Sequence, residues 1–393
     1  MPDTSSPAAG AGAAHIRLLL ELDRLHVEPD RIPGIRALAG EPDLDWGAFL
    51  DLAARHRLLP LVGRHVHRHR LDRRVEDGAL AFPYPWLFAS AYLGNRHRNQ
   101  ALCDQFGPLL ADLTAAGVPC AVRKGFALVE AVYHDAGVRR INDLDLLVDR
   151  ADAPRVHEVL LRYGYEQGQL SVDGDRIEPF DKATQMAWRM RMNNQLPYRK
   201  AGHRPDVSDY NVDLCHGIFP RGTHTDLTVG DLLARARPAV LCGAPSLVLE
   251  PADFLLDLCA HLYKEATSAA FVREGLDLQL SKFLDVALFA GSLAEADWDH
   301  FTERALGYGV GASVYYALHF TTALHPGAIP DRALDRLRPE NLDYLEGFGA
   351  PEGVDGHWSQ DFTARLFDRG RSREAGAAEP GPTQAVLSAR YHA

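Results

Sequence analysis

Two runs of sequence decide the fold: Val122-Arg-Lys-Gly-Phe-Ala-Leu-Val-Glu-Ala-Val-Tyr133 and Arg139-Arg-Ile-Asn-Asp-Leu-Asp-Leu-Leu-Val148. The first predicts the end of an apolar strand, a glycine turn and a helix, and the second predicts a basic loop and another strand. Side chains two residues apart in a strand project to the same face, so Asp143 and Asp145 share one face. Two carboxylates in so apolar a run are costly unless a cation neutralises them.

A third carboxylate extends this pattern. Asp213 is the single acid of Tyr210-Asn-Val-Asp-Leu-Cys-His-Gly-Ile218, which also predicts a strand. If this strand lies beside the first, the three carboxylates converge into a ligand set for two divalent cations around a triphosphate. Two alternatives stay open: Asp213 as a lone acid at a strand end, and Asp143 with Asp145 on an edge strand facing water.

Other D-x-D pairs of this acidic chain have local explanations. They are expected to cap helices or to form a turn, because each lies beside a predicted helix start or a glycine. These pairs are Asp43/Asp45, Asp173/Asp175 and Asp297/Asp299.

Lys124 and Gly125 stand at the predicted strand-to-helix turn. The first amides of a helix carry partial positive charge and bind anions, and glycine allows close approach of a phosphate. The alternative is a tight turn that simply requires a glycine. No Walker A motif is present. Arg139 and Arg140, which precede the acidic strand, are further candidates for contact with a triphosphate.

A later helix offers weaker candidates. His261, Lys264 and Glu265 follow an apolar stripe at positions i, i+3 and i+4. His261 and Lys264 are candidates for substrate binding across the cleft, and the alternative is a helix cap with an ion pair.

Working outward, the chain divides into a helical region, an alternating α/β region and a second helical region. This pattern predicts the α+β class, with a small mixed sheet flanked by N-terminal and C-terminal helices. We expect disorder at both ends, where small and polar residues dominate. The expected boundaries are 1–14 disordered, 15–116 helical, 117–225 the α/β core, 226–369 helical and 370–393 a mostly disordered tail.

Composition narrows the function classes. The net charge of −11 over 393 residues disfavours a broad nucleic-acid surface. Five scattered cysteines without a C-x-x-C pair indicate neither a disulfide framework nor a zinc site. No basic, apolar leader and no run long enough to span a bilayer is present. These features predict a cytoplasmic protein without a membrane partner.

The pattern of Lys124, Gly125, Leu128, Tyr133, Arg139, Asp143, Asp145, Leu147 and Val148 resembles the uncharacterised nucleotidyltransferase branch of the DNA polymerase β-type superfamily. The resemblance covers roughly residues 16–290. It implies transfer of a nucleoside monophosphate from an NTP to an acceptor, with two Mg²⁺ ions, or Mn²⁺, as cofactors. Asp143, Asp145 and Asp213 would be the catalytic metal ligands, and Lys124, Gly125, Arg139 and Arg140 would bind the nucleotide. The expected acceptor is a small molecule or a peptide.

The chain also departs from the family pattern. The wider superfamily has Gly-Ser in the turn, whereas Phe126 follows Gly125 here, and Cys215 stands where the branch often has histidine. Two alternative functions therefore stay open. One is a toxin-like nucleotidyltransferase acting on tRNA, and the other is a catalytically inactive nucleotide-binding or scaffold protein.

Overall fold

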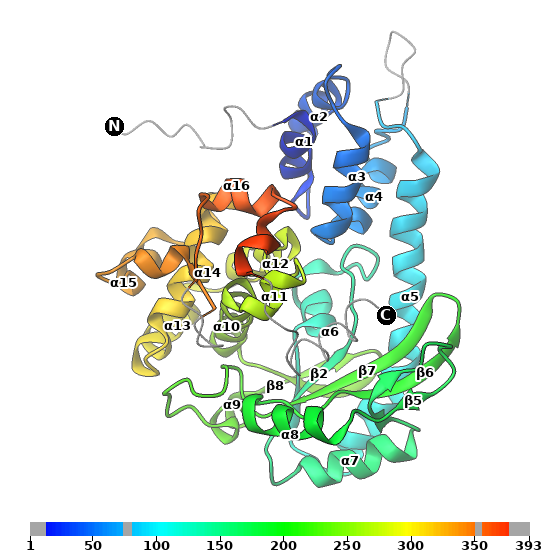
Figure 1. Cartoon of the computed structure of the whole chain (residues 1–393), viewed down its shortest axis with the longest axis vertical. Coiled ribbons are helices and arrows are strands. Elements are labelled where there is room, and N and C mark those ends of the chain that lie inside the picture. The colour runs from blue at the N-terminus through cyan, green and yellow to red at the C-terminus, as the bar shows by residue number, and fades with distance from the viewer. Residues whose placement is uncertain (1–12, 74–80, 350–355, 377–393) are drawn as a thin grey trace.

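Seven strands form one mixed sheet, as the computed structural model of the chain shows (Figure 1). The structure describes residues 13–73, 81–349 and 356–376. The strands of the sheet are β1 (Cys120–Arg123), β2 (Leu144–Val148), β3 (Glu166–Gln167), β6 (Tyr198–Arg204), β7 (Val207–Cys215), β8 (Arg237–Leu241) and β9 (Ala244–Val248). Their order across the sheet is β3-β6-β7-β2-β1-β9-β8. Two short ribbons pair β4 (Gln169–Leu170) with β5 (Ile177–Glu178) and β10 (Gly347–Phe348) with β11 (Gly356–His357).

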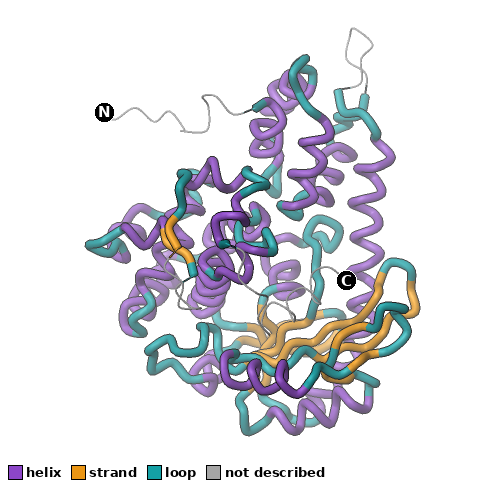
Figure 2. The backbone as a smooth tube through the Cα atoms, viewed as in Figure 1, coloured by secondary structure: helices purple, strands orange, loops and turns teal. Residues whose placement is uncertain are grey.

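Helices precede, interrupt and follow the sheet, so the α+β class is confirmed (Figure 2). The N-terminal helices are α1 (Ala14–Leu22), α2 (Ile32–Ala39), α3 (Trp46–Arg55), α4 (Leu59–Arg68) and α5 (Pro85–Ala115). Within the core lie α6 (Gly125–Leu128), a π-helical turn (Val129–Tyr133), α7 (Ala153–Arg162) and α8 (Lys182–Arg191). The later helices are α9 (Val229–Arg235), α10 (Pro251–Thr267), α11 (Ala269–Arg273), α12 (Leu280–Gly291), α13 (Glu295–Gly307), α14 (Gly311–Leu324), α15 (Asp331–Leu337) and α16 (Phe362–Phe367). Short 3₁₀ turns cover Pro29–Arg31, Asp343–Glu346 and Arg371–Ala375.

The centre of the sheet forms as the apolar runs indicated. β1 pairs with β2 in antiparallel register and β2 pairs with β7 in parallel register. The expected strand over 141–148 is shorter in the structure, because only Leu144–Val148 is extended and paired. Asp143 therefore lies directly before β2 rather than inside it, while Asp145 lies inside it.

Two of the local explanations for D-x-D pairs are visible. Asp45 caps α3 by accepting a hydrogen bond from the amide of Ala48 at 3.0 Å. Asp173 and Asp175 lie in the turn between β4 and β5.

The expected region boundaries need correction at three places. β8 and β9 continue the sheet beyond residue 225, so the expected helical region 226–369 contributes two strands to the core. Ala14 is buried at the start of α1. Arg371 is 3 % exposed and pairs with buried Asp277 at 2.9 Å, so the expected disorder is wrong for residues 370–376. The expected disordered residues 1–12 and 377–393 lie outside the described ranges.

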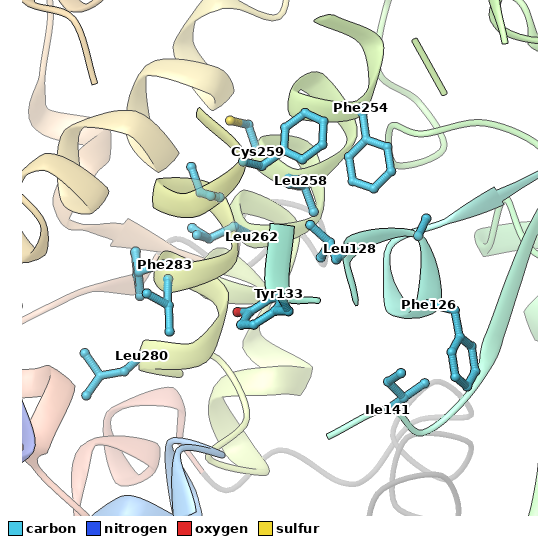
Figure 3. Packing of buried hydrophobic residues seen from close by; sticks show 14 of the residues in the cluster. Phe126, Leu128, Tyr133, Ile141, Phe254, Leu258, Cys259, Leu262, Leu280 and Phe283 are labelled. Carbon is cyan, nitrogen blue, oxygen red and sulfur yellow. The ribbon is translucent and has the colours of Figure 1, made fainter. Parts of the chain in front are cut away.

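The α6 segment packs against the later helices through apolar side chains (Figure 3). Leu128 and Tyr133 lie toward Leu258 and Leu262 of α10, with Phe283 of α12 close by, whereas Phe126 lies on the other side beside Ile141 and packs edge-on against Phe106 of α5. This contact places the turn before α6 against α10, which fixes one side of the site described next. No helix of the described residues is long and apolar enough to cross a membrane.

Candidate active site

Three carboxylates meet at the centre of the sheet. Asp145 on β2 is the register partner of Asp213 on β7, and Asp143 lies just before β2. One carboxylate oxygen from each of the three lies within 4.8 Å of the other two. Asp145 is 5 % exposed and Asp213 is 2 % exposed. The convergence expected from the sequence is therefore present.

A buried arginine stands next to this cluster. Arg123 on β1 is the register partner of Asp145, so Arg123, Asp145 and Asp213 form a row across three strands. The guanidinium of Arg123 donates to Asp257 of α10 at 2.8 Å, and to the carbonyl of Gly217 at 3.4 Å. Although burial opposes the charge, Asp257 keeps the pKa of Arg123 above its usual value. This ion pair ties the sheet to α10.

The turn after β1 has unusual backbone geometry. Lys124 has φ 46° and ψ −139°, and Gly125 has φ 37°. A lysine with positive φ is strained, and such strain concentrates at functional sites. The ammonium of Lys124 lies 3.0 Å from Oδ2 of Asp145. Although burial opposes the charge, Asp145 raises the pKa of Lys124 above its usual value. Lys124 thus places a positive charge on the acidic cluster.

Arg139 lines the cleft and is paired with an acid of the chain itself. Its guanidinium donates to both carboxylate oxygens of Asp285 on α12, at 2.9 Å and 2.8 Å. The hydroxyl of Tyr133 donates to the same carboxylate at 2.7 Å. A guanidinium held bidentately in this way has few donors left for a nucleotide. The structure therefore shows Arg139 as a link between the loop before β2 and α12.

Helix α5 holds the same loop from the other side. The side-chain amide of Asn95 donates to the carbonyl of Gly137 at 2.8 Å, and that of Asn99 donates to the carbonyl of Arg139 at 2.8 Å. Arg98 donates to the carbonyl of Ile141. Asn99 is fully buried and Asn95 is 6 % exposed. These contacts fix the backbone that carries Asp143, because the loop continues into β2.

Asp143 and Asp145 line a cleft between the sheet and the helices on both sides, whereas Asp213 is not among its lining residues. The cleft is also lined by Lys124 and Gly125, by Arg57 and Arg140, and by residues of α10 and α12. His261 lines the cleft and lies 3.1 Å from Glu265, whose carboxylate also pairs with Lys282. Burial lowers the pKa of His261 to about 4 although Glu265 opposes the shift, so its ring is neutral at pH 7.

Lys264 is placed differently. It is not among the residues that line the cleft, and its ammonium lies 6.0 Å from the ring centre of Phe271. The expected pairing of His261 and Lys264 on one substrate is therefore not visible in the geometry, whereas a contact between His261 and Glu265 is, as a hydrogen bond from a neutral ring.

Several residues of the site escaped the sequence analysis. Asp257, Asp285, Asn95 and Asn99 act through partners far away in sequence, so no local motif marks them. Gln279 is 2 % exposed, lines the cleft and has no hydrogen-bond partner for Oε1 among the described residues. Cys215, by contrast, was named from the sequence as a departure from the family pattern; its sulfur lies 3.9 Å from Asp145, and burial raises the pKa of its thiol to about 11.

Comparison with known proteins agrees with this geometry. A search of curated proteins finds no match. A family model described as uncharacterised nucleotidyltransferase matches residues 42–326, a span that contains the acidic cluster, the Lys124–Gly125 turn and most of the cleft. The chain belongs to this uncharacterised nucleotidyltransferase family.

Proposed function

We propose that the protein transfers a nucleoside monophosphate from an NTP to a small-molecule or peptide acceptor and releases pyrophosphate. The observation that supports this proposal most directly is the convergence of Asp143, Asp145 and Asp213, with one oxygen of each within 4.8 Å of the others. Three carboxylates so close together repel one another unless cations lie between them. Lys124 offsets part of this repulsion at Asp145, and a bound divalent cation would offset more of it.

The donor set fits magnesium. Mg²⁺ prefers hard oxygen ligands and is usually bound by one or two carboxylates together with substrate phosphates. Asp143, Asp145 and Asp213 would hold two Mg²⁺ ions, or Mn²⁺. Bound there, the ions would neutralise charge on the triphosphate and polarise its α-phosphoryl group.

The residues around the cluster would orient the two substrates. Gly125 would let the turn approach the β- and γ-phosphates, and Lys124 would shift its charge from Asp145 towards them. Asp213 would accept a hydrogen bond from the hydroxyl or amine of the acceptor and take its proton. The acceptor atom would form the new bond to the α-phosphorus as the bond to the leaving pyrophosphate oxygen breaks. Positioning of this kind supplies a large part of the rate in phosphoryl chemistry.

The proposal has a direct test. The full-length protein is incubated with the four NTPs and Mg²⁺, and pyrophosphate release is measured together with intact-mass spectrometry for attached nucleotide. Pyrophosphate release by the wild type, its loss in Asp143→Ala and its retention in Asp173→Ala are expected, because Asp173 is an exposed turn residue away from the cleft.

Other outcomes identify the alternatives. Nucleotide binding without turnover, with small molecules and peptides supplied as acceptors, would indicate an inactive nucleotide-binding protein. Turnover that requires added tRNA would indicate the toxin-like activity. Full pyrophosphate release by Asp143→Ala would reject the proposed mechanism.

A further inference from the structure

Three arginines from separate parts of the chain gather beside the acidic cluster. Arg57 comes from the segment between α3 and α4, Arg98 from α5, and Arg140 from the loop before β2. All three line one cavity, and Arg57 and Arg140 also line the main cleft with Asp143. The cavity and the cleft thus share a basic rim.

Among the described residues, neither Arg98 nor Arg140 forms an ion pair with a carboxylate, although Asp209, Asp143 and Asp206 act on Arg98 at longer range. Arg140 is exposed and forms no ion pair with any acid in the part of the chain that the structure describes. Asp206 is the one acid lining the cavity, and both of its oxygens already accept hydrogen bonds from Arg204, at 3.0 Å and 3.2 Å. The backbone fixes Arg98, which donates to the carbonyl of Ile141, two residues before Asp143.

The three charges also repel one another. Burial and the neighbouring Arg140 lower the pKa of Arg98 to about 10, and burial together with Arg57 lowers the pKa of Arg140. Burial is the larger cause of both shifts, and Asp209, Asp143 and Asp206 oppose the shift at Arg98; an anion bound among the arginines would raise both pKa values further. The grouping is also unexpected for a chain whose net charge is −11. Perturbed pKa values beside a cleft are a feature of functional sites.

We propose that Arg57, Arg98 and Arg140 form a subsite for an oxyanion, a phosphate or a carboxylate group, at the mouth of the active-site cleft. Planar guanidinium groups suit such oxyanions because they donate parallel hydrogen bonds. Which molecule carries this anion depends on the proposed nucleotidyl transfer. The anion is either the terminal phosphate of the NTP or an anionic group on the acceptor. In the second case the acceptor is an acidic small molecule or a peptide with an acidic or phosphorylated side chain.

Binding measurements on the full chain test the subsite without knowledge of the nucleobase or the acceptor. Inorganic tripolyphosphate with Mg²⁺ serves as the first probe and stands for the triphosphate. Inorganic phosphate, titrated into protein saturated with tripolyphosphate and Mg²⁺, serves as the second probe and stands for an acceptor anion. Both are measured by calorimetry on the wild type, Arg140→Gln, Arg98→Lys and Arg57→Gln. Arg162→Gln, which removes an exposed arginine on α7, is the matched control.

Two results support the subsite and separate the sources. If Arg140→Gln weakens tripolyphosphate binding about tenfold, about 1.4 kcal/mol, the subsite holds the terminal phosphate of the NTP. If tripolyphosphate binding is unchanged and the second probe binds about tenfold more weakly, the subsite belongs to the acceptor. Arg98→Lys should weaken the same probe, because lysine keeps the charge and loses the planar fork.

The subsite is rejected if the wild type binds neither probe, or if all three arginine variants bind both probes as the wild type and Arg162→Gln do. This failure differs from failure of the proposed function. A subsite that binds anions in a protein that releases no pyrophosphate would leave the subsite standing and remove the enzyme. If the protein releases pyrophosphate but the arginine variants bind anions as the wild type does, the proposed enzyme stands and the subsite is rejected.

Discussion

Asp145 and Asp213 face each other as register partners on the adjacent parallel strands β2 and β7. Because paired residues of neighbouring strands share a face, the two carboxylates are held close by the sheet itself, independently of any loop. Sites built on strands keep their geometry better than sites built on loops. The sheet therefore holds like charges together at a cost in stability, and this cost leads to the first prediction.

Asp213→Asn should separate function from stability. Removing one of three mutually repelling carboxylates should raise the thermal midpoint of the metal-free protein, while nucleotidyl transfer falls by at least about 100-fold. Mg²⁺ should stabilise the wild type more than the variant, because it binds the folded state of the wild type more tightly. Differential scanning fluorimetry with and without Mg²⁺, together with pyrophosphate release, measures both effects. A variant that is less stable without metal and equally stabilised by Mg²⁺ would contradict a metal role for Asp213.

Lys124 should compete with metal for Asp145, because its ammonium lies 3.0 Å from that carboxylate. Lys124→Met should therefore bind Mg²⁺ more tightly than the wild type in the absence of nucleotide. The same substitution should slow transfer, because the turn loses the charge proposed to seat the phosphates. Calorimetric titration with Mg²⁺ alone measures the first effect. Weaker Mg²⁺ binding by Lys124→Met would show that Lys124 supports the metal site instead of competing for it.

The centre of the site could be predicted because its signals are local. The apolar runs around Asp145 and Asp213 predict strands, and the period of two assigns the acids to faces. Strand pairing was the one non-local step, and the structure pairs β2 with β7 as the prediction required. Asp45 as a helix cap is local in the same way.

Other parts of the fold and site depend on partners that no local pattern shows. The first half of α5, which begins at Pro85, buries Asn95 and Asn99 against loop carbonyls, so its start is not marked by an apolar stripe. Arg139 is adjacent to the acidic strand and suggested a nucleotide contact. Its partner Asp285 lies 146 residues away, so only the folded chain reveals the pair.

β8 and β9 were missed for a related reason. Each strand contains a proline, Pro238 and Pro245, which weakens a strand signal. The structure accommodates them at the end of the sheet, where β8 is the edge strand and leaves one side unpaired. Their position beside β1 could not be inferred from the helical pattern around them.

The Arg139–Asp285 pair should be worth more to stability than a surface ion pair. Arg139→Met leaves Asp285, 5 % exposed, without its bidentate partner, and should lower the free energy of unfolding by about 3–5 kcal/mol. The double variant Arg139→Met/Asp285→Leu should recover part of this loss, since no buried charge is then left unpaired. Urea denaturation of the single and double variants measures both the loss of stability and its partial recovery. If Arg139 instead contacted the nucleotide, Arg139→Met would weaken nucleotide binding with little change in stability.

Buried His56 should make the protein sensitive to mild acid. Its Nδ1 accepts the amide hydrogen of Leu280 at 3.2 Å, and burial, joined by Arg55 and Arg371, lowers its pKa from 6.5 to about 3. Between these two values the unfolded chain binds a proton that the folded chain does not. The contribution of neutral His56 to the free energy of unfolding is therefore fully present above pH 6.5 and is lost as the pH falls towards 3. For His56 alone the loss should reach about 2 kcal/mol between pH 7 and pH 5.

The variant His56→Asn isolates this contribution. Its side-chain oxygen can accept the Leu280 amide hydrogen and does not titrate in this range, so its free energy of unfolding should fall less steeply with acid. Urea denaturation at pH 7, 6 and 5 should show that the difference in the free energy of unfolding between wild type and variant narrows by about 2 kcal/mol across that range. Parallel pH dependences of the two proteins would mean that His56 gains its proton at the same pH in the folded and the unfolded chain, so that its pKa is not lowered on folding.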